Sequence, residues 1–414
     1  MMIVSLFLKD LEGYTMVKIH MLPVGVGDFF WIRFGKDESL EHNILIDGGH
    51  EKFSGIYEHI FRLIASENQK ALIILTHIDA DHIQGAAQGI ANLSCDLLNP
   101  VIDRILLNTG RGISKEIHDK REHSPERQPL MPEDQILVFE RNLNHSFHDA
   151  ETFLEMIEKK GLSSKLVDYT IAGTEMVYGE AKLRFVSPGK EELERLTEKW
   201  ETYNQCRGIH FTSANTPEKD DLQFLMNKKF GADPSVTNRS SLAFLFEYQD
   251  IKGAFLGDAA APVVYKGLRK LGLATPYPLD FLKLPHHGGR YNMSDKLLKA
   301  FPTRNYLLST EGIPKSDVPS KVLFAHILKN QMRYDLFASQ CSKEDLAREE
   351  KDSGNRGQTV TVYSNYAWWD EAYAGRYFSN RDMKDYIQSG LIDFARLTAK
   401  PLHIRDGLFF SRLI

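Results

Sequence analysis

The segment LTHIDADHIQG, residues 75–85, concentrates side chains that bind metals. Within six residues it carries two imidazoles and two carboxylates, on His77, Asp79, Asp81 and His82. The apolar run ALIIL directly before the motif predicts a buried strand, and a turn after such a strand gives ligands a fixed backbone. Several deprotonated ligands on a fixed backbone are what a transition metal requires. A solvated, charged turn is the alternative interpretation, but four such residues at this spacing favour a metal site.

Two later segments also place reactive side chains at predicted strand ends. The segment FLGDA follows an apparent hairpin and contributes Asp258. LDFLKLPHHGG, residues 279–289, predicts a strand that ends in His286 and His287. The same strand contains Lys283, an isolated cation that either extends to the surface along its apolar stem or binds substrate. Strand, turn and helix recur in this order, which is typical of a layered α/β fold with its chemistry at strand ends.

The length of 414 residues exceeds that of a usual single domain, and 42% apolar with 26% charged residues is a globular balance. We predict a peripheral N-terminal extension over residues 1–16, a main domain over 17–330, and a C-terminal extension over 331–414 packed on or beside it. Two polar segments without a clear period, 111–135 and 190–235, are predicted to be insertions.

Periodicity predicts the elements that hold the reactive groups. Residues 17–47 have the pattern of a three-stranded meander, and the segments SSLAFLFEY and GAFLGDA that of a hairpin. Helices are predicted over 54–67 and over 146–161, the second with Ser146 as N-cap and Gly161 as terminator. One more strand, QTVTVYS, is predicted near the C-terminus.

Composition limits the choice of partners. The formal net charge of −5 gives no global attraction to phosphate backbones, so any contact with nucleic acid is expected to be local. The three cysteines lie far apart, which matches neither a disulfide framework nor a thiolate zinc site and favours a reducing cytoplasm. No apolar stretch approaches the roughly 18 residues of a spanning helix, so no membrane contact is expected. Near the C-terminus lies an aromatic cluster of Trp368, Trp369, Tyr373 and Tyr377. It either packs in a core or an interface, or it stacks on nucleic-acid bases.

The order of these motifs resembles that of the metallo-β-lactamase-fold hydrolases. Their His-x-His-x-Asp-His signature appears here as HIDADH, with Asp79 in the place of the second histidine. The chain looks like the branch represented by the hydrolase domain of ComEC-type competence proteins, which the segments VGVGD, ILIDGG, FVSPG, NRSS, FLGDA and LKLPHHGG also resemble in order. The resemblance covers residues 17–315 and implies an α/β fold, the αββα sandwich of the metallo-β-lactamase type.

The resemblance implies a centre for two divalent metal ions. It places His77 and Asp79 on the first metal, Asp81 and His82 on the second, and Asp258 between the two. Replacing an imidazole by a carboxylate makes the ligand set harder, which shifts the preference from zinc toward manganese. We therefore expect one or two ions of Mn²⁺ or Zn²⁺.

One of the two adjacent histidines is expected to close the second metal site. We favour His287 because it directly precedes glycine, and this leaves His286 to act on the substrate. Many relatives carry a histidine after the proline-glycine turn of the middle motif, whereas SPGK here ends in Lys190. The first metal thus lacks a ligand, so that it binds weakly, binds only with substrate, or recruits a distant histidine from among His145, His148 and His210.

Other polar residues near the motifs have two interpretations each. Asp47 is either a turn residue or a hydrogen-bond acceptor that orients a metal ligand. Asn238, Ser240 and Ser241 either begin a strand or offer hydrogen-bond donors to a phosphate. Together with Lys283, we take Asn238 and Ser240 as the candidate substrate-binding residues.

These inferences predict a metal-dependent hydrolase, most simply a phosphodiesterase or nuclease that acts on DNA. A metal-generated hydroxide would be the nucleophile, with Asp81, Asp258 and His286 as the catalytic residues. ComEC-type proteins import DNA through membrane spans that this chain lacks, so a degradative role is expected, for instance in phage defence, alone or with protein partners. Two alternatives remain open: hydrolysis of a small ester, amide or phosphorylated metabolite, and a non-catalytic scaffold.

Overall fold

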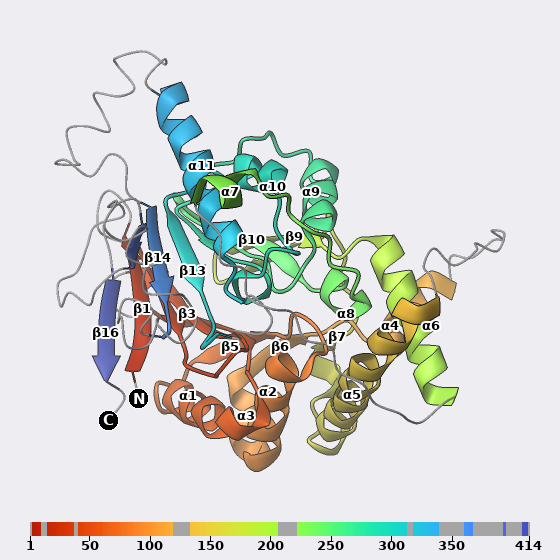
Figure 1. Cartoon of the computed structure of the whole chain (residues 1–414). Helices are drawn as coiled ribbons and strands as arrows, with labels where there is room; N and C mark the ends of the chain where they lie inside the picture. The colour runs from red at the N-terminus through yellow and green to blue at the C-terminus, as the bar shows by residue number, and fades with distance from the viewer. Residues whose placement is uncertain are drawn as a thin grey trace.

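The computed structural model describes residues 2–9, 15–36, 40–118, 133–205, 222–312, 318–338, 360–366, 392–394 and 408–412. Two eight-stranded sheets face each other, and helices cover the outer face of each sheet (Figure 1). This order of layers, helix, sheet, sheet, helix, is the predicted αββα fold class, which is thereby confirmed.

The first sheet has the strand order β16-β1-β2-β3-β4-β5-β6-β7. Strands β1 to β4 run antiparallel, which confirms the predicted meander, and β4 to β7 run parallel. The register sets Trp31 opposite Leu45 and Ile46 beside Ile74. Its strands are β1 (Met2–Lys9), β2 (Thr15–Met21), β3 (Phe29–Lys36), β4 (His42–Asp47), β5 (Lys70–Ile74), β6 (Ile102–Leu106), β7 (Leu166–Val167) and β16 (Leu408–Arg412).

The second sheet has the order β15-β14-β13-β12-β11-β10-β9-β8. Strands β8 to β11 are antiparallel and β11 to β15 parallel, and the predicted hairpin is β10 with β11. Its strands are β8 (Glu175–Tyr178), β9 (Ala181–Ser187), β10 (Ala243–Tyr248), β11 (Ile251–Phe255), β12 (Phe281–Lys283), β13 (Asn305–Leu308), β14 (Val360–Ser364) and β15 (Ile392–Phe394).

The helices pack through one apolar face each. In α1, for example, Ile56, Ile60 and Ile64 recur at helical spacing and are buried. The helices are α1 (Ser54–Ser66), α2 (Ala80–Asn92), α3 (Cys95–Val101), α4 (Gly110–His118), α5 (Glu133–Lys159), α6 (Lys190–Gln205), α7 (Leu222–Asn227), α8 (Val236–Arg239), α9 (Ala261–Lys270), α10 (Asp295–Ala300) and α11 (Lys321–Ala338). No helix in the described ranges combines the length and the apolar character needed to cross a bilayer.

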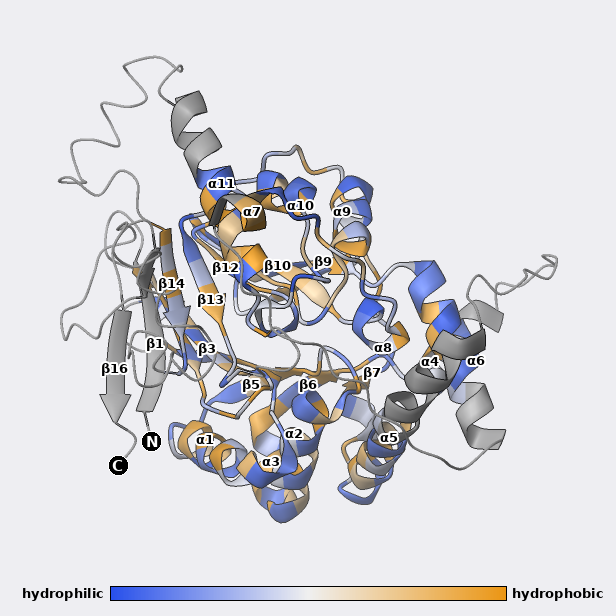
Figure 2. Ribbon diagram, viewed as in Figure 1, coloured by the Kyte–Doolittle hydropathy of each residue, from blue (hydrophilic) through white to orange (hydrophobic). Residues whose placement is uncertain are grey.

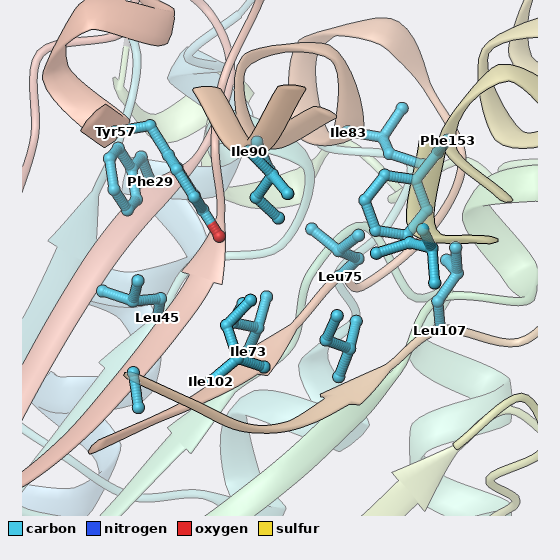
Figure 3. Packing of buried hydrophobic residues seen from close by; sticks show 14 of the residues in the cluster. Phe29, Leu45, Tyr57, Ile73, Leu75, Ile83, Ile90, Ile102, Leu107 and Phe153 are labelled. Carbon is cyan, nitrogen blue, oxygen red and sulfur yellow. The ribbon is translucent and has the colours of Figure 1, made fainter. Parts of the chain in front are cut away.

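Three apolar clusters fill the spaces between the four layers. One lies between the first sheet and its helices, where Phe29, Leu45 and Ile73 meet Tyr57 and Phe153 (Figure 3). A second lies between the two sheets, and a third between the second sheet and helices α9, α10 and α11. Because the inner strands are covered on both faces, some carry buried apolar residues in succession rather than alternating, as Ala71, Leu72, Ile73 and Ile74 do in β5 (Figure 2).

Both predicted extensions take part in the sheets. Residues 2–9, within the predicted N-terminal extension, form β1, which pairs with β2 and β16 near the edge of the first sheet. The boundary predicted at residue 330 lies within α11. Beyond it, β14 and β15 extend the second sheet and β16 extends the first. Strand pairing between segments distant in sequence cannot be seen in local periodicity.

The predicted insertions carry helices. Segment 111–135 contains most of α4, and segment 190–235 contains α6 and α7. Helix α5 begins at Glu133, so Ser146 lies within the helix and is not the predicted N-cap, whereas Gly161 follows the helix end with a φ of 67°. The aromatic group at residues 368–377 lies outside the described residues.

The loops before β3 and after β4 fit closely against the start of α2. A Cβ atom on Gly27 would lie 1.8 Å from the carbonyl oxygen of Asp81, and one on Gly48 would lie 2.3 Å from the nitrogen of Ala86. Glycine is therefore required at both places. The same contact includes a backbone hydrogen bond of 2.8 Å from Gly48 to the carbonyl oxygen of His82. The helix that begins in the metal-binding motif is thus fixed by two glycine loops.

Candidate metal centre

The motif residues converge at the strand ends of both sheets. The turn after β5 and the first turn of α2 supply four of them, and the loops after β11 and β12 supply Asp258 and the histidine pair. A backbone hydrogen bond of 2.8 Å from Leu242 to Thr76 joins the two sheets here, and one of 3.1 Å from His286 to Gly257 joins the loops after β12 and β11 of the second sheet. The site is therefore built at the seam where both sheets end.

Four side chains surround what we call the second position: Asp81, His82, Asp258 and His287. The Nε2 atoms of His82 and His287 lie 3.3 Å apart. They lie 3.4 and 3.6 Å from Oδ2 of Asp258, and Oδ2 of Asp81 lies 3.3 Å from Nε2 of His287. His82, Asp258 and His287 are buried. Two imidazole nitrogens and two carboxylates facing one point form a suitable ligand set for a divalent cation.

Each of the two imidazoles at the second position is oriented through its Nδ1 atom, the nitrogen that faces away from the cation position. Nδ1 of His82 lies 2.8 Å from Oδ2 of Asp47, whose other oxygen accepts a hydrogen bond from the backbone nitrogen of Thr76. Nδ1 of His287 lies 3.2 Å from the carbonyl oxygen of Ser309. These contacts fix the ring planes and direct both Nε2 atoms at the cation position. Asp47 therefore has the geometry of a ligand-orienting acceptor, the second of its two interpretations.

Asp28 and Lys283 form a buried ion pair beside the second position. Lys283 is 1% exposed, its ammonium contacts Oδ2 of Asp28 and donates to the carbonyl oxygen of Gly257, and it lies 3.8 Å from Oδ1 of Asp258. Oδ1 of Asp28 approaches Nδ1 of His287 at 3.5 Å. Asp28 belongs to the group of four potential ligands with His82, Asp258 and His287, but it lies behind the imidazole and orients it.

The first position, formed by His77, Asp79 and Asp258, is more open. Nε2 of His77 lies 3.5 Å from Oδ2 of Asp79 and 3.9 Å from Oδ2 of Asp258. The hydroxyls of Ser146 and Thr237 donate to the two oxygens of Asp79 at 2.6 and 3.1 Å. The carboxylate of Asp79 is thus held by two hydroxyls.

Buried polar atoms without a hydrogen-bond partner indicate that these residues fit a divalent cation. Among the described side chains, Nε2 of His77 and Oδ1 of Asp258 are buried and have no hydrogen-bond partner. Buried polar atoms in native proteins are almost always paired, so unpaired ligand atoms at one point indicate a missing partner. A cation between the two positions would satisfy the atoms that face it.

The charges of the cluster shift its pKa values strongly. Burial alone would lower the pKa of His287, but the carboxylates of Asp258 and Asp28 raise it to about 10. Asp258 and Asp47 likewise raise the pKa of the buried His82. Burial opposes ionisation of Asp81, yet His82 and His287 hold its pKa below the usual value. Without a cation the centre therefore holds protons on its imidazoles, and a metal would displace them.

His286 and His287 both adopt left-handed backbone conformations, with φ of 47° and 55°. Such φ values are unfavourable for residues with a Cβ atom and persist only where the surroundings enforce them. The turn lets adjacent residues face the same centre from different sides. Nε2 of His286 lies 3.9 Å from Oδ2 of Asp258, and its side chain is 35% exposed. His286 thus borders the cluster on the solvent side, whereas His287 lies inside it.

Three of the residues predicted to bind substrate use their donors inside the fold. The Lys283 ammonium is occupied by Asp28, as described above. The amide nitrogen of the buried Asn238 donates to Asp233 at 2.7 Å, and the hydroxyl of the buried Ser240 donates to the carbonyl oxygen of Thr237. Burial leaves none of these donors directed at solvent. The hydroxyl of Ser241 accepts a 3.3 Å hydrogen bond from the backbone nitrogen of Asp258.

Lys190, which stands where many metallo-β-lactamase-fold hydrolases carry a histidine, and the candidate ligand His148 both have exposed side chains. Lys190 begins α6 with a side chain that is 66% exposed and pairs with Glu194 at 3.7 Å. His148 is exposed on α5. The side chain of His145 and the whole of His210 lie outside the described part of the chain.

Sequence reasoning missed three residues of the site. Asp28 ends the segment VGVGD, and its glycines were the available signal for a backbone that approaches α2 closely. Asp233 and Asn292 lie in loops and make hydrogen bonds beside His286. Asn292 follows the histidine pair by only five residues, but nothing in its type or spacing distinguishes it from a turn residue.

Comparison with known proteins adds little to this description. Neither a family model nor a curated protein sequence matches the chain. Among solved structures, one match is a point mutant of the CmlA beta-hydroxylase, with a TM-score of 0.30 and 10% sequence identity. The match covers 69% of this chain, and the chain spans 45% of that protein.

Proposed function

We propose that this protein is a metal-dependent hydrolase that cleaves phosphodiesters, with DNA as the substrate. The observation that carries the proposal is the convergence of Asp81, His82, Asp258 and His287 at one buried point, with the half-buried His286 beside it. The four ligand residues would hold the metal, and His286 lies on the solvent side of them. This arrangement suits attack by water on a substrate held between the metal and His286. A dication bound there would lower the pKa of a coordinated water to about 7 and so would supply hydroxide near neutral pH.

The chain's own residues have distinct tasks in this proposal. Asp258 lies within 3.9 Å of all four centre histidines, so its carboxylate is placed to bind cation and to orient the attacking water. Asp81 and His82 begin α2 and keep the cation fixed to the fold. His286 is placed to exchange a proton with the substrate oxygen that leaves.

The rim of the site supports a nucleic-acid substrate. The loop that carries the histidine pair continues into Arg290 and Tyr291, and the guanidinium of Arg290 lies 4.9 Å from the centroid of the Tyr291 ring. The Tyr291 side chain is exposed. A cation and an aromatic ring beside a phosphodiesterase centre suit a phosphate and a base of a single strand. Because the net charge is −5, we place the contact with nucleic acid locally at this rim.

Degradation of foreign DNA, as in phage defence, is the role we propose for this activity, with the cytoplasm as its location. Protein partners in a larger assembly would select the target. Mn²⁺ is the proposed ion, with Zn²⁺ second, because carboxylates match the imidazoles in number at the second position.

The test incubates purified protein with Mn²⁺, Zn²⁺ or Mg²⁺ and measures cleavage of single-stranded DNA, duplex DNA, RNA and bis-p-nitrophenyl phosphate. Asp81→Ala and His82→Ala should each abolish cleavage and leave the circular dichroism spectrum unchanged. His148→Ala is the matched control, because this histidine is exposed on α5, and it should keep full activity. Cleavage retained by either motif variant would refute the proposal, and cleavage of small esters without any phosphodiester would redirect it to another substrate class.

A further inference from the structure

His286 has one nitrogen engaged by the protein and one directed at the reaction centre. Nδ1 lies 2.7 Å from Oδ1 of Asn292, and Nε2 faces Oδ2 of Asp258 at 3.9 Å from the solvent side. A histidine that only supports the fold would have both nitrogens satisfied. His326 is such a case, because its nitrogens contact Asp295 and the carbonyl oxygen of Lys228 at 2.8 and 2.7 Å.

The orientation of the Asn292 amide is fixed by its neighbours. Its nitrogen donates to Oδ2 of Asp233 and to the carbonyl oxygen of Asp258, both at 2.7 Å. Both contacts are acceptors, so the nitrogen must face them and the amide oxygen must face His286. The oxygen can only accept, which requires the proton of His286 to lie on Nδ1.

Asp233 in turn anchors the whole arrangement. Its carboxylate is buried and accepts hydrogen bonds from Asn238 at 2.7 Å and from the backbone nitrogen of Ser235 at 2.8 Å, besides the one from Asn292. Oδ2 of Asp233 also lies 3.4 Å from Nδ1 of His286. The backbone nitrogen of Asp233 donates to the carbonyl oxygen of Tyr291, which joins this loop to the loop of the histidine pair. The position of Asn292 is thus determined from two loops.

We propose that Asn292 and Asp233 are positioning residues that hold His286 as its Nδ1-protonated tautomer, with Nε2 aimed at the leaving group. The inference rests on the proposed phosphodiesterase function. When water gives one proton to the solvent and adds to phosphorus as hydroxide, the bond to the leaving oxygen breaks and its electron pair stays on that oxygen. The oxygen then takes a proton from Nε2 of the doubly protonated ring, which returns to the neutral form with its remaining proton on Nδ1. The acceptor on Asn292 stabilises this product tautomer.

The arrangement predicts a dependence on the leaving group. An alkoxide, as from a dinucleotide, requires a proton when it leaves, whereas p-nitrophenolate does not. Asn292→Ala should therefore lower turnover of a dithymidine phosphate by about 10²-fold, the lower end of the range for general acid catalysis, and that of bis-p-nitrophenyl phosphate only a few-fold. Asp233→Asn keeps the side-chain volume and should also lower the ratio of dithymidine phosphate turnover to bis-p-nitrophenyl phosphate turnover. In a His286→Ala background neither substitution should change the ratio further.

The closing experiment reads the tautomer directly by ¹⁵N NMR on histidine-labelled protein loaded with Zn²⁺, with the His286 signal assigned by its loss in His286→Ala. The wild type should show the Nδ1–H form, and Asn292→Ala a mixture of forms. Asp295→Asn, which breaks the comparable contact of His326, is the matched control and should leave both the His286 signal and the substrate ratio unchanged. An unchanged tautomer in Asn292→Ala would overturn the inference. A protein that cleaves no phosphodiester would refute the function instead, because the NMR result does not depend on activity.

Discussion

The two metal positions share Asp258 but differ in how their other ligands are held. At the second position, His82 and His287 are oriented from behind by Asp47 and by the carbonyl oxygen of Ser309, and their Nε2 atoms lie 3.3 Å apart. At the first position, the nearest pair, Nε2 of His77 and Oδ2 of Asp79, lies 3.5 Å apart, and Asp79 is held by two hydroxyls instead of lying against a second imidazole. We expect tight binding at the second position and weak binding at the first.

The difference also concerns charge. The second position has a built-in cation nearby, because Lys283 is paired with Asp28 and lies 3.8 Å from Asp258. At the first position the carboxylate of Asp79 is held by neutral hydroxyls of Ser146 and Thr237. The carboxylate of Asp258 thus lies near a lysine, whereas that of Asp79 is held by hydrogen bonds from neutral hydroxyls. Four predictions test this asymmetry.

The largest effect is expected at the histidine pair. His287→Ala removes an oriented ligand and should lose the tightly bound metal together with all activity. His286→Ala should keep the metal and lower turnover by roughly 10²- to 10⁴-fold, the range typical of a general acid. Metal analysis of the two purified variants, with turnover measured in parallel, decides between them. If His286→Ala emerges metal-poor and His287→Ala loaded, the assignment is reversed.

The buried lysine should matter most when no metal is present. Lys283→Met leaves Asp28 charged and unpaired in the interior, which should lower the free energy of unfolding of the metal-free protein by about 3–5 kcal/mol. A bound dication should recover part of this loss, and thermal melting with and without Zn²⁺ measures both. Lys182→Met is the control, since its partner Glu175 is exposed and such surface pairs contribute about 0–1 kcal/mol. Equal losses in the free energy of unfolding for the two variants would show that the buried ion pair contributes no more to stability than a surface pair.

Metal affinity at the second position should rise with pH. The pKa of His287 is raised from its ordinary value of 6.5 to about 10, and that of His82 is raised as well, so a metal arriving at pH 7 displaces two protons. The affinity should then rise by roughly 100-fold per pH unit. Conversely, the stability that protonated His287 gives the metal-free protein is complete below pH 6.5 and is lost as the pH rises to about 10. Calorimetry in buffers of different ionisation enthalpy counts the released protons, and a count of zero would contradict the scheme.

Much of this fold could be predicted from sequence because its inner strands are covered on both sides. The runs ALIIL and ILIDGG are apolar without alternation, and their ends carry the ligands. The pairing of β1 with β16 could not be predicted, because it joins residues about four hundred positions apart and leaves no local pattern. The extent of α11 across residue 330, where we predicted a boundary, was likewise not visible in the sequence, because the segment has no clear helical period.

The ligands were more predictable than the residues behind them. His82 and Asp258 could be inferred because metals require a few residue types on fixed turns. The burial of Lys283 could not be predicted, because a lone lysine in a strand usually reaches the surface, and only the tertiary contact with Asp28 reveals it. Asn292 and Asp233 act through hydrogen-bond geometry, which residue type and spacing do not encode.

The smallest effect is expected from Ser146, which tests the open side of the comparison. Its hydroxyl donates to Oδ1 of Asp79 at 2.6 Å from within α5, so Ser146→Ala removes one of two hydrogen bonds that fix this carboxylate. A hydrogen bond to a charged group contributes about 1.5–3 kcal/mol, but solvent can replace part of it because Asp79 is 28% exposed. The first metal equivalent fills the tight second position, and the second equivalent fills the first position beside Asp79. Binding of the second equivalent should therefore weaken by roughly 10-fold or less, while binding of the first equivalent is unchanged. Calorimetric titration resolves the two equivalents, with Ser66→Ala as control because that hydroxyl bonds only within α1. A change in the first equivalent instead would mean that Asp79 contributes to the tight position, and that the two positions are not independent.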